Sequence, residues 1–197
     1  KIEYYYGIPS PFAYLGSSRF QSIAKKYDAE IIEKPCDLVG GIFAKTGGLP
    51  VPERSFQRQK YRLDELKRWS EFLNIQINIK PKFFPPRDPH LPAKFTIAAN
   101  LLGTKVLFGH ELLKQLWSEE KDISDEKNIE NASNNFKINF KELSVLAKSE
   151  QVSKIYVDNT NEAVEKNVFG VPTYIFNNEL FWGQDRLEFL ERALKNA

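Results

Sequence analysis

The sequence predicts an α/β protein in which a β-α-β unit at the start of the chain and a β-β-α unit at its end are separated by a block of helices. The first unit begins with an apolar and aromatic run, Ile2 to Tyr6, which Gly7 ends. Ser10-Pro11 then starts a helical pattern, because serine is a preferred N-cap and proline suits the first helical position. Ala29 to Pro35 is the second predicted strand, and the right-handed crossover rule makes the two strands parallel.

The C-terminal unit is a predicted β-hairpin followed by a helix. Thr173 to Phe176 and Leu180 to Trp182 are short β-branched or aromatic runs, and the polar pair Asn177-Asn178 between them favours a tight turn. Pro172 precedes the first of these strands, where a proline indicates an edge, a bulge or a cis peptide bond. Leucine and alanine then recur at helical spacing from Arg186 to Lys195.

Between the two units the sequence is mainly helical. Residues 37–52, rich in glycine and proline, predict a loop with a short helix around residues 42–45. The prolines of residues 80–89 exclude a helix and predict an extended segment. Helical patterns cover residues 55–73, 93–102, 106–118, 125–133, 140–149 and 152–166. In the first of these helices, the expected buried side includes Tyr61 and Leu66.

Composition and charge argue against several classes of function. The chain has 197 residues, with 28 Lys and Arg against 26 Asp and Glu, and the two signs are interleaved. This distribution does not favour nucleic acid or an anionic membrane surface as a partner. No apolar run approaches the length needed to cross a membrane. The one cysteine, Cys36, forms no internal disulfide, and residues 1–6 lack the apolar core of a signal peptide, so the expected location is cytoplasmic.

Two motifs give the sequence a resemblance to a known family. Gly170-Val171-Pro172-Thr173, followed by Phe181 to Leu187, is similar to the C-terminal segment of the 2-hydroxychromene-2-carboxylate isomerases and of the related kappa-class glutathione transferases. Ser10 to Leu15 resembles the Ser-Pro-Phe segment of the same families, and the similarity continues over nearly the whole chain. The resemblance implies a thioredoxin-like fold with an inserted all-helical domain, which is the DsbA-like architecture. The expected domains are a thioredoxin-like domain of residues 1–36 plus 167–197 and an inserted helical domain of residues 37–166.

The resemblance implies that Ser10 holds the sulfur of a bound glutathione. From the residue alone, a helix N-cap is the simpler interpretation. A thiol with a pKa of about 8.5 is mostly protonated at neutral pH, and a hydroxyl donor at the positive end of a helix stabilises the thiolate. Ser10 would therefore activate the nucleophile of the cofactor without attacking the substrate itself. Dithiol exchange is excluded at this position, because Ser10-Pro11-Phe12-Ala13 contains no thiol.

The same resemblance implies that several further residues bind glutathione. Val171 and Pro172 would pair with its backbone as an added strand does, although a turn proline before a strand is the plain alternative. Gln184 and Asp185 would hold the γ-glutamyl end, where a carboxylate is a natural partner for the ammonium group. Asp185 is equally suited to the N-cap of the last helix. Arg58 stands where the family usually has lysine, and it would face a carboxylate of glutathione or of the substrate.

The activity implied by the resemblance is glutathione-dependent cis-trans isomerisation of a conjugated aromatic 2-oxo acid, a small-molecule substrate, by a homodimer. The thiolate would add to the substrate and later leave, so that a double bond is single long enough to rotate. Two alternatives stay open: a kappa-like transferase or peroxidase, and a non-catalytic thioredoxin-like module that holds peptides at Pro172. The sequence departs from the family at Gly48, where an asparagine commonly contacts glutathione. No metal site is expected, since His90 and His110 lack the spacing of metal ligands.

Overall fold

The computed structural model describes residues 1–104 and 107–197 of the chain, so the predicted helix start at Val106 lies outside the described residues. Its centre is a four-stranded sheet in the order β2-β1-β3-β4. The strands are β1 (Ile2–Tyr6), β2 (Ile31–Pro35), β3 (Thr173–Phe176) and β4 (Glu179–Trp182). β1 is parallel to β2 and antiparallel to β3, and β3 and β4 form the predicted antiparallel hairpin.

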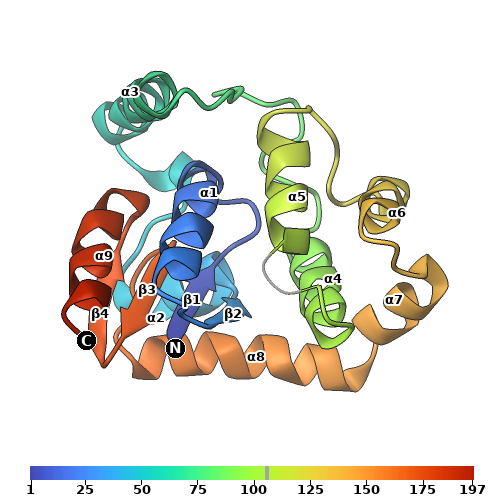
Figure 1. Cartoon of the computed structure of the whole chain (residues 1–197). Coiled ribbons are helices and arrows are strands. Elements are labelled where there is room, and N and C mark those ends of the chain that lie inside the picture. The colour runs from blue at the N-terminus through green and yellow to red at the C-terminus, as the bar shows by residue number, and fades with distance from the viewer. Residues whose placement is uncertain (105–106) are drawn as a thin grey trace.

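Side chains alternate across β1 and divide the core into two parts. Tyr4 and Tyr6 point into the main core, on the face of the sheet that is covered by α1 (Pro11–Lys26) and α9 (Leu187–Lys195). Tyr5 points to the other face and packs in a smaller cluster with Ile42 and Ile175. That face is covered by η1 (Leu38–Phe43), a π-helical segment, and by α8 (Glu150–Glu165), the long helix across the bottom of Figure 1. Both faces of the sheet are therefore covered by helices, and the central strands β1 and β3 are the most buried.

The remaining helices form a separate layer beside the sheet, on the right in Figure 1. Its members are α4 (His90–Leu101), α5 (Leu107–Trp117), α6 (Glu126–Asn135) and α7 (Phe140–Ala147). Phe95, Phe108 and Trp117 from this layer are fully buried in the same core cluster as the tyrosines of β1. One continuous apolar core thus joins the helical layer to the sheet.

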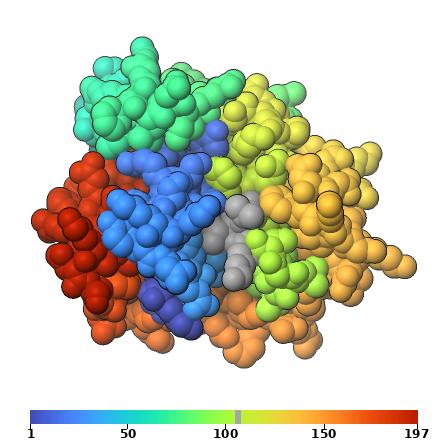
Figure 2. All heavy atoms as spheres, viewed as in Figure 1, coloured from blue at the N-terminus to red at the C-terminus, as the bar shows by residue number. Residues whose placement is uncertain are grey.

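The segment after β2 leads to a helix that stands apart from both layers. It contains α2 (Ala44–Thr46), the 3-10 turn η2 (Val51–Glu53) and α3 (Phe56–Leu73). In the space-filling view of Figure 2, the green surface of α3 and the segment after it spans the top of the molecule, above α1 in blue and α5 in yellow-green. Of the residues of α3, only Leu66 is fully buried. The expected burial of Tyr61 is wrong, since 59% of that residue is exposed.

The predicted architecture, an α/β thioredoxin-like fold with inserted helices, is confirmed. The order of strands and α-helices agrees with the sequence pattern, with element ends that differ by a few residues, whereas the π-helical segment η1 and the 3-10 turn η2 form within the predicted loop of residues 37–52. The division into residues 1–36 plus 167–197 and residues 37–166 stays a prediction. α8 contacts β2 and η1 along one part of its length and α4 and α7 along another, so this helix belongs to the packing of both parts.

Candidate functional site

Ser10 caps the N-terminus of α1, as its sequence position predicts. Its backbone is extended, its Oγ accepts a hydrogen bond from the Ala13 N–H at 3.2 Å, and Pro11 is the first residue of the helix. The residue is 9% exposed, and its hydroxyl proton is donated to no acceptor in the described part of the chain. No acidic residue lies in the first turn of this 16-residue helix. Ser10 therefore combines a free O–H donor with the positive end of the helix macrodipole.

The loop before β3 lies beside the Ser10 turn. A Cβ added at Gly7 would be 3.9 Å from Val171 Cγ2, and the Ser10 N–H donates to the Gly7 carbonyl at 2.9 Å. The Val171–Pro172 peptide bond is cis. Val171 is 8% exposed, yet neither its N–H nor its C=O is hydrogen-bonded to another group among the described residues. An extended ligand backbone would satisfy both groups in the way an added strand does.

Gln184 and Asp185 begin the short 3-10 turn η3 (Gln184–Arg186) that leads into α9, and they lie in different environments. Gln184 is 1% exposed, and its side-chain Oε1 and its backbone oxygen both accept from the Arg19 guanidinium of α1. Asp185 is exposed and its carboxylate pairs with Arg186 at 2.7 Å. It is not the N-cap of α9, which has Arg186 at that position and no side-chain cap bond. The capping alternative for Asp185 is therefore wrong.

Gly16 explains how this turn comes so close to α1. A Cβ at position 16 would lie 2.7 Å from Gln184 Cβ and 3.5 Å from Gln184 Cα. Because real Cβ contacts are not that short, only glycine lets the helix and the turn pack at this distance. The glycine and Arg19 together hold Gln184 and Asp185 beside the helix that carries Ser10. Arg19 was missed by the sequence reasoning, since its partner is 165 positions away and no local pattern marks it.

The sequence departs from the family at Arg58, in α3, and at Gly48, in the loop between α2 and η2. Arg58 is exposed in the first turn of α3, where the Ser55 hydroxyl caps its backbone N–H at 3.4 Å. At Gly48 an added Cβ would be 1.9 Å from the ring of Phe43. The Phe43 ring thus occupies the space in which a side chain at position 48 would begin, and the Arg54 guanidinium lies 5.9 Å from the centre of that ring.

The remaining titratable candidates have structural partners. Burial raises the pKa of the Cys36 thiol well above its usual value, and its Sγ lies 3.6 Å from the Tyr6 carbonyl, so it is an unreactive core residue. His110 stacks on Tyr14, and His90 Nδ1 is 3.1 Å from the Tyr156 hydroxyl. Within residues 1–104 and 107–197 no three His, Cys, Asp or Glu side chains gather in a way that could hold a metal ion. In the same residues no helix is both long and apolar enough to cross a membrane.

Comparisons with known proteins agree with this fold. The model of the DsbA-like thioredoxin domain matches residues 1–195. A 2-hydroxychromene-2-carboxylate isomerase of Pseudomonas sp. (strain C18) is 25% identical over 202 residues, covering 100% of this chain and 91% of the relative. Glutathione S-transferase kappa 1 of Caenorhabditis elegans is 21% identical, covering 99% of this chain and 91% of the relative.

A solved structure of a 2-hydroxychromene-2-carboxylate isomerase superposes with a TM-score of 0.81 at 24% sequence identity, over 99% of this chain and 94% of that one. The resemblance inferred from the motifs therefore extends over the full described length. At this level of identity the superposition establishes the fold. Since the family model covers nearly every residue, the chain belongs to the DsbA-like thioredoxin domain family.

Proposed function

We propose that the protein is a glutathione-dependent cis-trans isomerase acting on a conjugated aromatic 2-oxo acid. The observation that carries the proposal is that two sets of hydrogen-bonding groups without partners among the described residues lie close together. Ser10 offers a free hydroxyl donor at the N-terminus of α1, and the neighbouring Val171 offers an unpaired backbone N–H and C=O. A cysteine-containing peptide fits both, because its backbone pairs with Val171 while its sulfur reaches Ser10.

Each residue of the site has a distinct task in this proposal. When bound, glutathione supplies a thiolate that adds reversibly to the conjugated double bond, which rotates while it is single, so that glutathione is regenerated. Ser10 donates its hydroxyl proton to the sulfur, and the α1 N-terminus adds a partial positive charge, so the thiolate is stabilised at neutral pH. Asp185 faces the γ-glutamyl ammonium, with Gln184 held beside it by Arg19. Arg58 attracts a carboxylate.

A kappa-like transferase is the second candidate, because one of the relatives carries that name. The two activities use the same thiolate and differ in whether the thiol is consumed. The test is to supply 2-hydroxychromene-2-carboxylate, the compound in the name of the relative, with a substoichiometric amount of glutathione, and to measure both the isomer ratio and the remaining free thiol. The isomerase proposal predicts many turnovers with the thiol conserved. Loss of one thiol per product, or conjugation of chlorodinitrobenzene without isomerisation, would contradict the isomerase proposal and favour the transferase.

The homodimer and the cytoplasmic location also belong to this proposal. The homodimer follows from the sequence resemblance, and the location follows from the single buried cysteine, Cys36. Light scattering after size-exclusion chromatography measures the mass directly, and a mass of one chain at micromolar concentration would contradict the dimer. A binding-module function would instead appear as peptide binding without any effect of glutathione.

A further inference from the structure

One side of α3 carries an arginine, Arg62, toward the interior of the molecule. Arg58, Arg62 and Leu66 are spaced four residues apart and therefore lie along one stripe of the helix. Leu66 is the buried residue of α3, so this stripe is the inward one. Arg58, at the start of the helix, is exposed, whereas Arg62 is half-buried. The inward side of α3 thus places a guanidinium where an apolar side chain is the ordinary choice.

Arg62 lies against two aromatic rings from other elements. Its guanidinium carbon is 5.3 Å from the centre of the Phe84 ring and 5.9 Å from the centre of the Trp117 ring, and the two ring centres are 5.0 Å apart. Phe84 belongs to the extended segment after α3, and Trp117 ends α5. Such contacts hold a guanidinium in place and leave its N–H groups free to donate in its own plane.

No carboxylate in the described part of the chain balances this charge. Arg62 has neither a hydrogen bond nor an ion pair there, and neither Arg54 nor Arg58 pairs with an acidic side chain. Burial, and then the charge of Arg54, lowers the pKa of Arg62 to about 10, which leaves it a cation at neutral pH. Burial and the charge of Arg58 likewise lower the pKa of Arg54. Three neighbouring cations without a counter-charge form an arrangement that an anion would stabilise.

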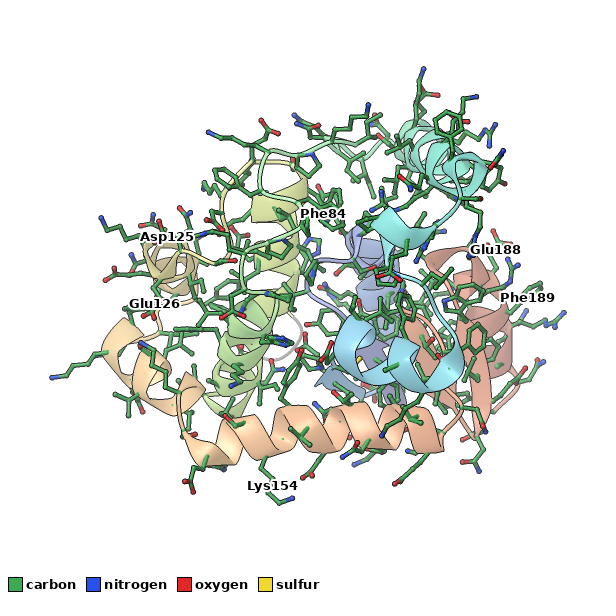
Figure 3. All side chains as sticks on the ribbon, turned by 180° about the vertical axis from the view of Figure 1, so that it is seen from behind. Phe84, Asp125, Glu126, Lys154, Glu188 and Phe189 are labelled. Atoms are coloured by element: carbon green, nitrogen blue, oxygen red, sulfur yellow. The ribbon has the colours of Figure 1, made fainter. Side chains whose placement is uncertain are left out.

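The cluster is connected to the Ser10 site through α1. Tyr14, one turn after Ser10, donates its hydroxyl proton to the Gln76 carbonyl at 3.0 Å, and α1 packs against both α3 and α5. Trp117 ends α5 and Gln76 follows α3, so the elements that hold the Arg62 rings pack beside α1. Figure 3 shows the labelled Phe84 between the ends of α1 and α5, on the side that faces α3.

We propose that Arg62 is the specificity residue that binds the carboxylate of the aromatic acid substrate, with the half-buried Phe84 beside the place of its planar body and the fully buried Trp117 holding the guanidinium from the core side. The guanidinium donates two parallel N–H bonds to the carboxylate, and the Phe84 ring supplies apolar contact to the conjugated part. This assignment deepens the proposed isomerase function and rests on it for the identity of the natural substrate. Two arginines of the same helix then bind two different carboxylates: Arg58 binds that of glutathione, and Arg62 binds that of the substrate.

The experiment is calorimetric binding of cinnamate, a conjugated aromatic carboxylate, with cinnamyl alcohol as its neutral counterpart. The variants are Arg62→Met, Arg62→Lys and, as a matched control, Arg68→Met on the outer side of the same helix, where Arg68 is exposed and pairs with Glu65. We expect Arg62→Met to weaken cinnamate binding about 10- to 100-fold, as the loss of a charge-assisted pair predicts. Arg62→Lys should lie in between, because lysine keeps the charge without the planar fork.

The controls decide what a loss of binding means. Arg68→Met should bind cinnamate as the wild type does, and cinnamyl alcohol should bind all four proteins within about threefold. Equal loss of acid and alcohol, or wild-type protein that does not prefer the acid, would overturn the assignment. Glutathione is titrated separately into each protein. If Arg62→Met weakens glutathione and leaves cinnamate unchanged, Arg62 belongs to the glutathione site and the proposal fails. If the wild type does not bind glutathione, the isomerase function fails while the cinnamate titration still decides the role of Arg62.

Discussion

The carboxyl group of Glu33 provides a prediction about pH and stability that follows directly from packing. Glu33 lies on β2, its Oε1 accepts from the Tyr6 hydroxyl, and its Oε2 is buried without a hydrogen bond among the described residues. A Cβ added at Gly109 of α5 would be 2.8 Å from Oε1, so the helical layer closes over the group. Burial raises the pKa of Glu33 from 4.5 to about 7, against a smaller lowering by the hydrogen bond from Tyr6.

The sign of the effect follows from proton binding. Below pH 4.5 the carboxyl group is protonated in the folded and the unfolded chain alike, so it adds no pH dependence there. Between pH 4.5 and about 7 the unfolded chain ionises while the folded chain keeps its proton, so the free energy of unfolding falls as the pH rises. A difference of two to three pKa units corresponds to about 3 kcal/mol, which is a large part of the stability of an ordinary domain.

The perturbation is Glu33→Gln, which keeps a neutral hydrogen-bonding group of the same shape. Urea unfolding of wild type and variant is measured at several pH values from 4.5 to 8. We expect the free energy of unfolding of the variant to gain about 3 kcal/mol relative to wild type across that interval. The reason is that only the wild type has a carboxyl group that ionises more readily in the unfolded chain than in the folded one. Glu30→Gln, which removes an exposed carboxylate paired with Lys1, is the control and should follow the wild-type slope. Parallel curves for Glu33→Gln and wild type would refute the reasoning.

Two glycine substitutions test the close contacts around the site. Gly16→Ala should destabilise the protein by about 1–3 kcal/mol in urea unfolding, although alanine favours a helix, because its Cβ would be 2.7 Å from Gln184 Cβ. The control is Ser18→Ala at an exposed position of the same helix, which should be neutral or stabilising. A stabilising Gly16→Ala would show that the turn is not tightly held. Gly48→Asn, which restores the residue usual in the family, should lower the melting temperature and not improve glutathione binding in calorimetry, because the new side chain must displace the Phe43 ring. A gain in glutathione affinity without loss of stability would contradict the observed packing.

Local sequence signals predicted much of the fold, because the physics that acts on them is local. Ser10 caps α1, and the ring of Pro11 fixes a backbone φ angle that suits the first helical position. Asn177 and Asn178 both have positive φ angles, 49° and 63°, which asparagine tolerates better than most residues, and the two strands beside them pair as a hairpin. The alternation in Ile2 to Tyr6 separates the two faces of the sheet as a period of two requires.

Long-range packing accounts for what the sequence did not predict. Helical periodicity shows which residues share a side of α3, but not whether another element covers that side, so Tyr61 was expected inside and is exposed. Asp185 has the right residue type for a cap, yet the 3-10 turn shifts the start of α9 past it. The motifs gave Ser10 and the Val171–Pro172 loop, whereas Arg19 and Arg62 are defined by partners distant in the sequence.

The most direct test of the central claim is the pKa of the glutathione thiol when bound to the protein, followed by ultraviolet absorbance of the thiolate across pH. Ser149→Ala is the matched control for Ser10→Ala, because Ser149 caps α8 with the same 3.2 Å bond from its helix N–H and carries no proposed contact to glutathione. The account predicts a lowered thiol pKa with wild type and with Ser149→Ala, and a rise of about 1–2 units with Ser10→Ala, since a hydrogen bond to a charged group contributes about 1.5–3 kcal/mol. A wild-type protein that leaves the thiol pKa at its free value, or a Ser10→Ala variant that lowers it as wild type does, would contradict the assignment of Ser10.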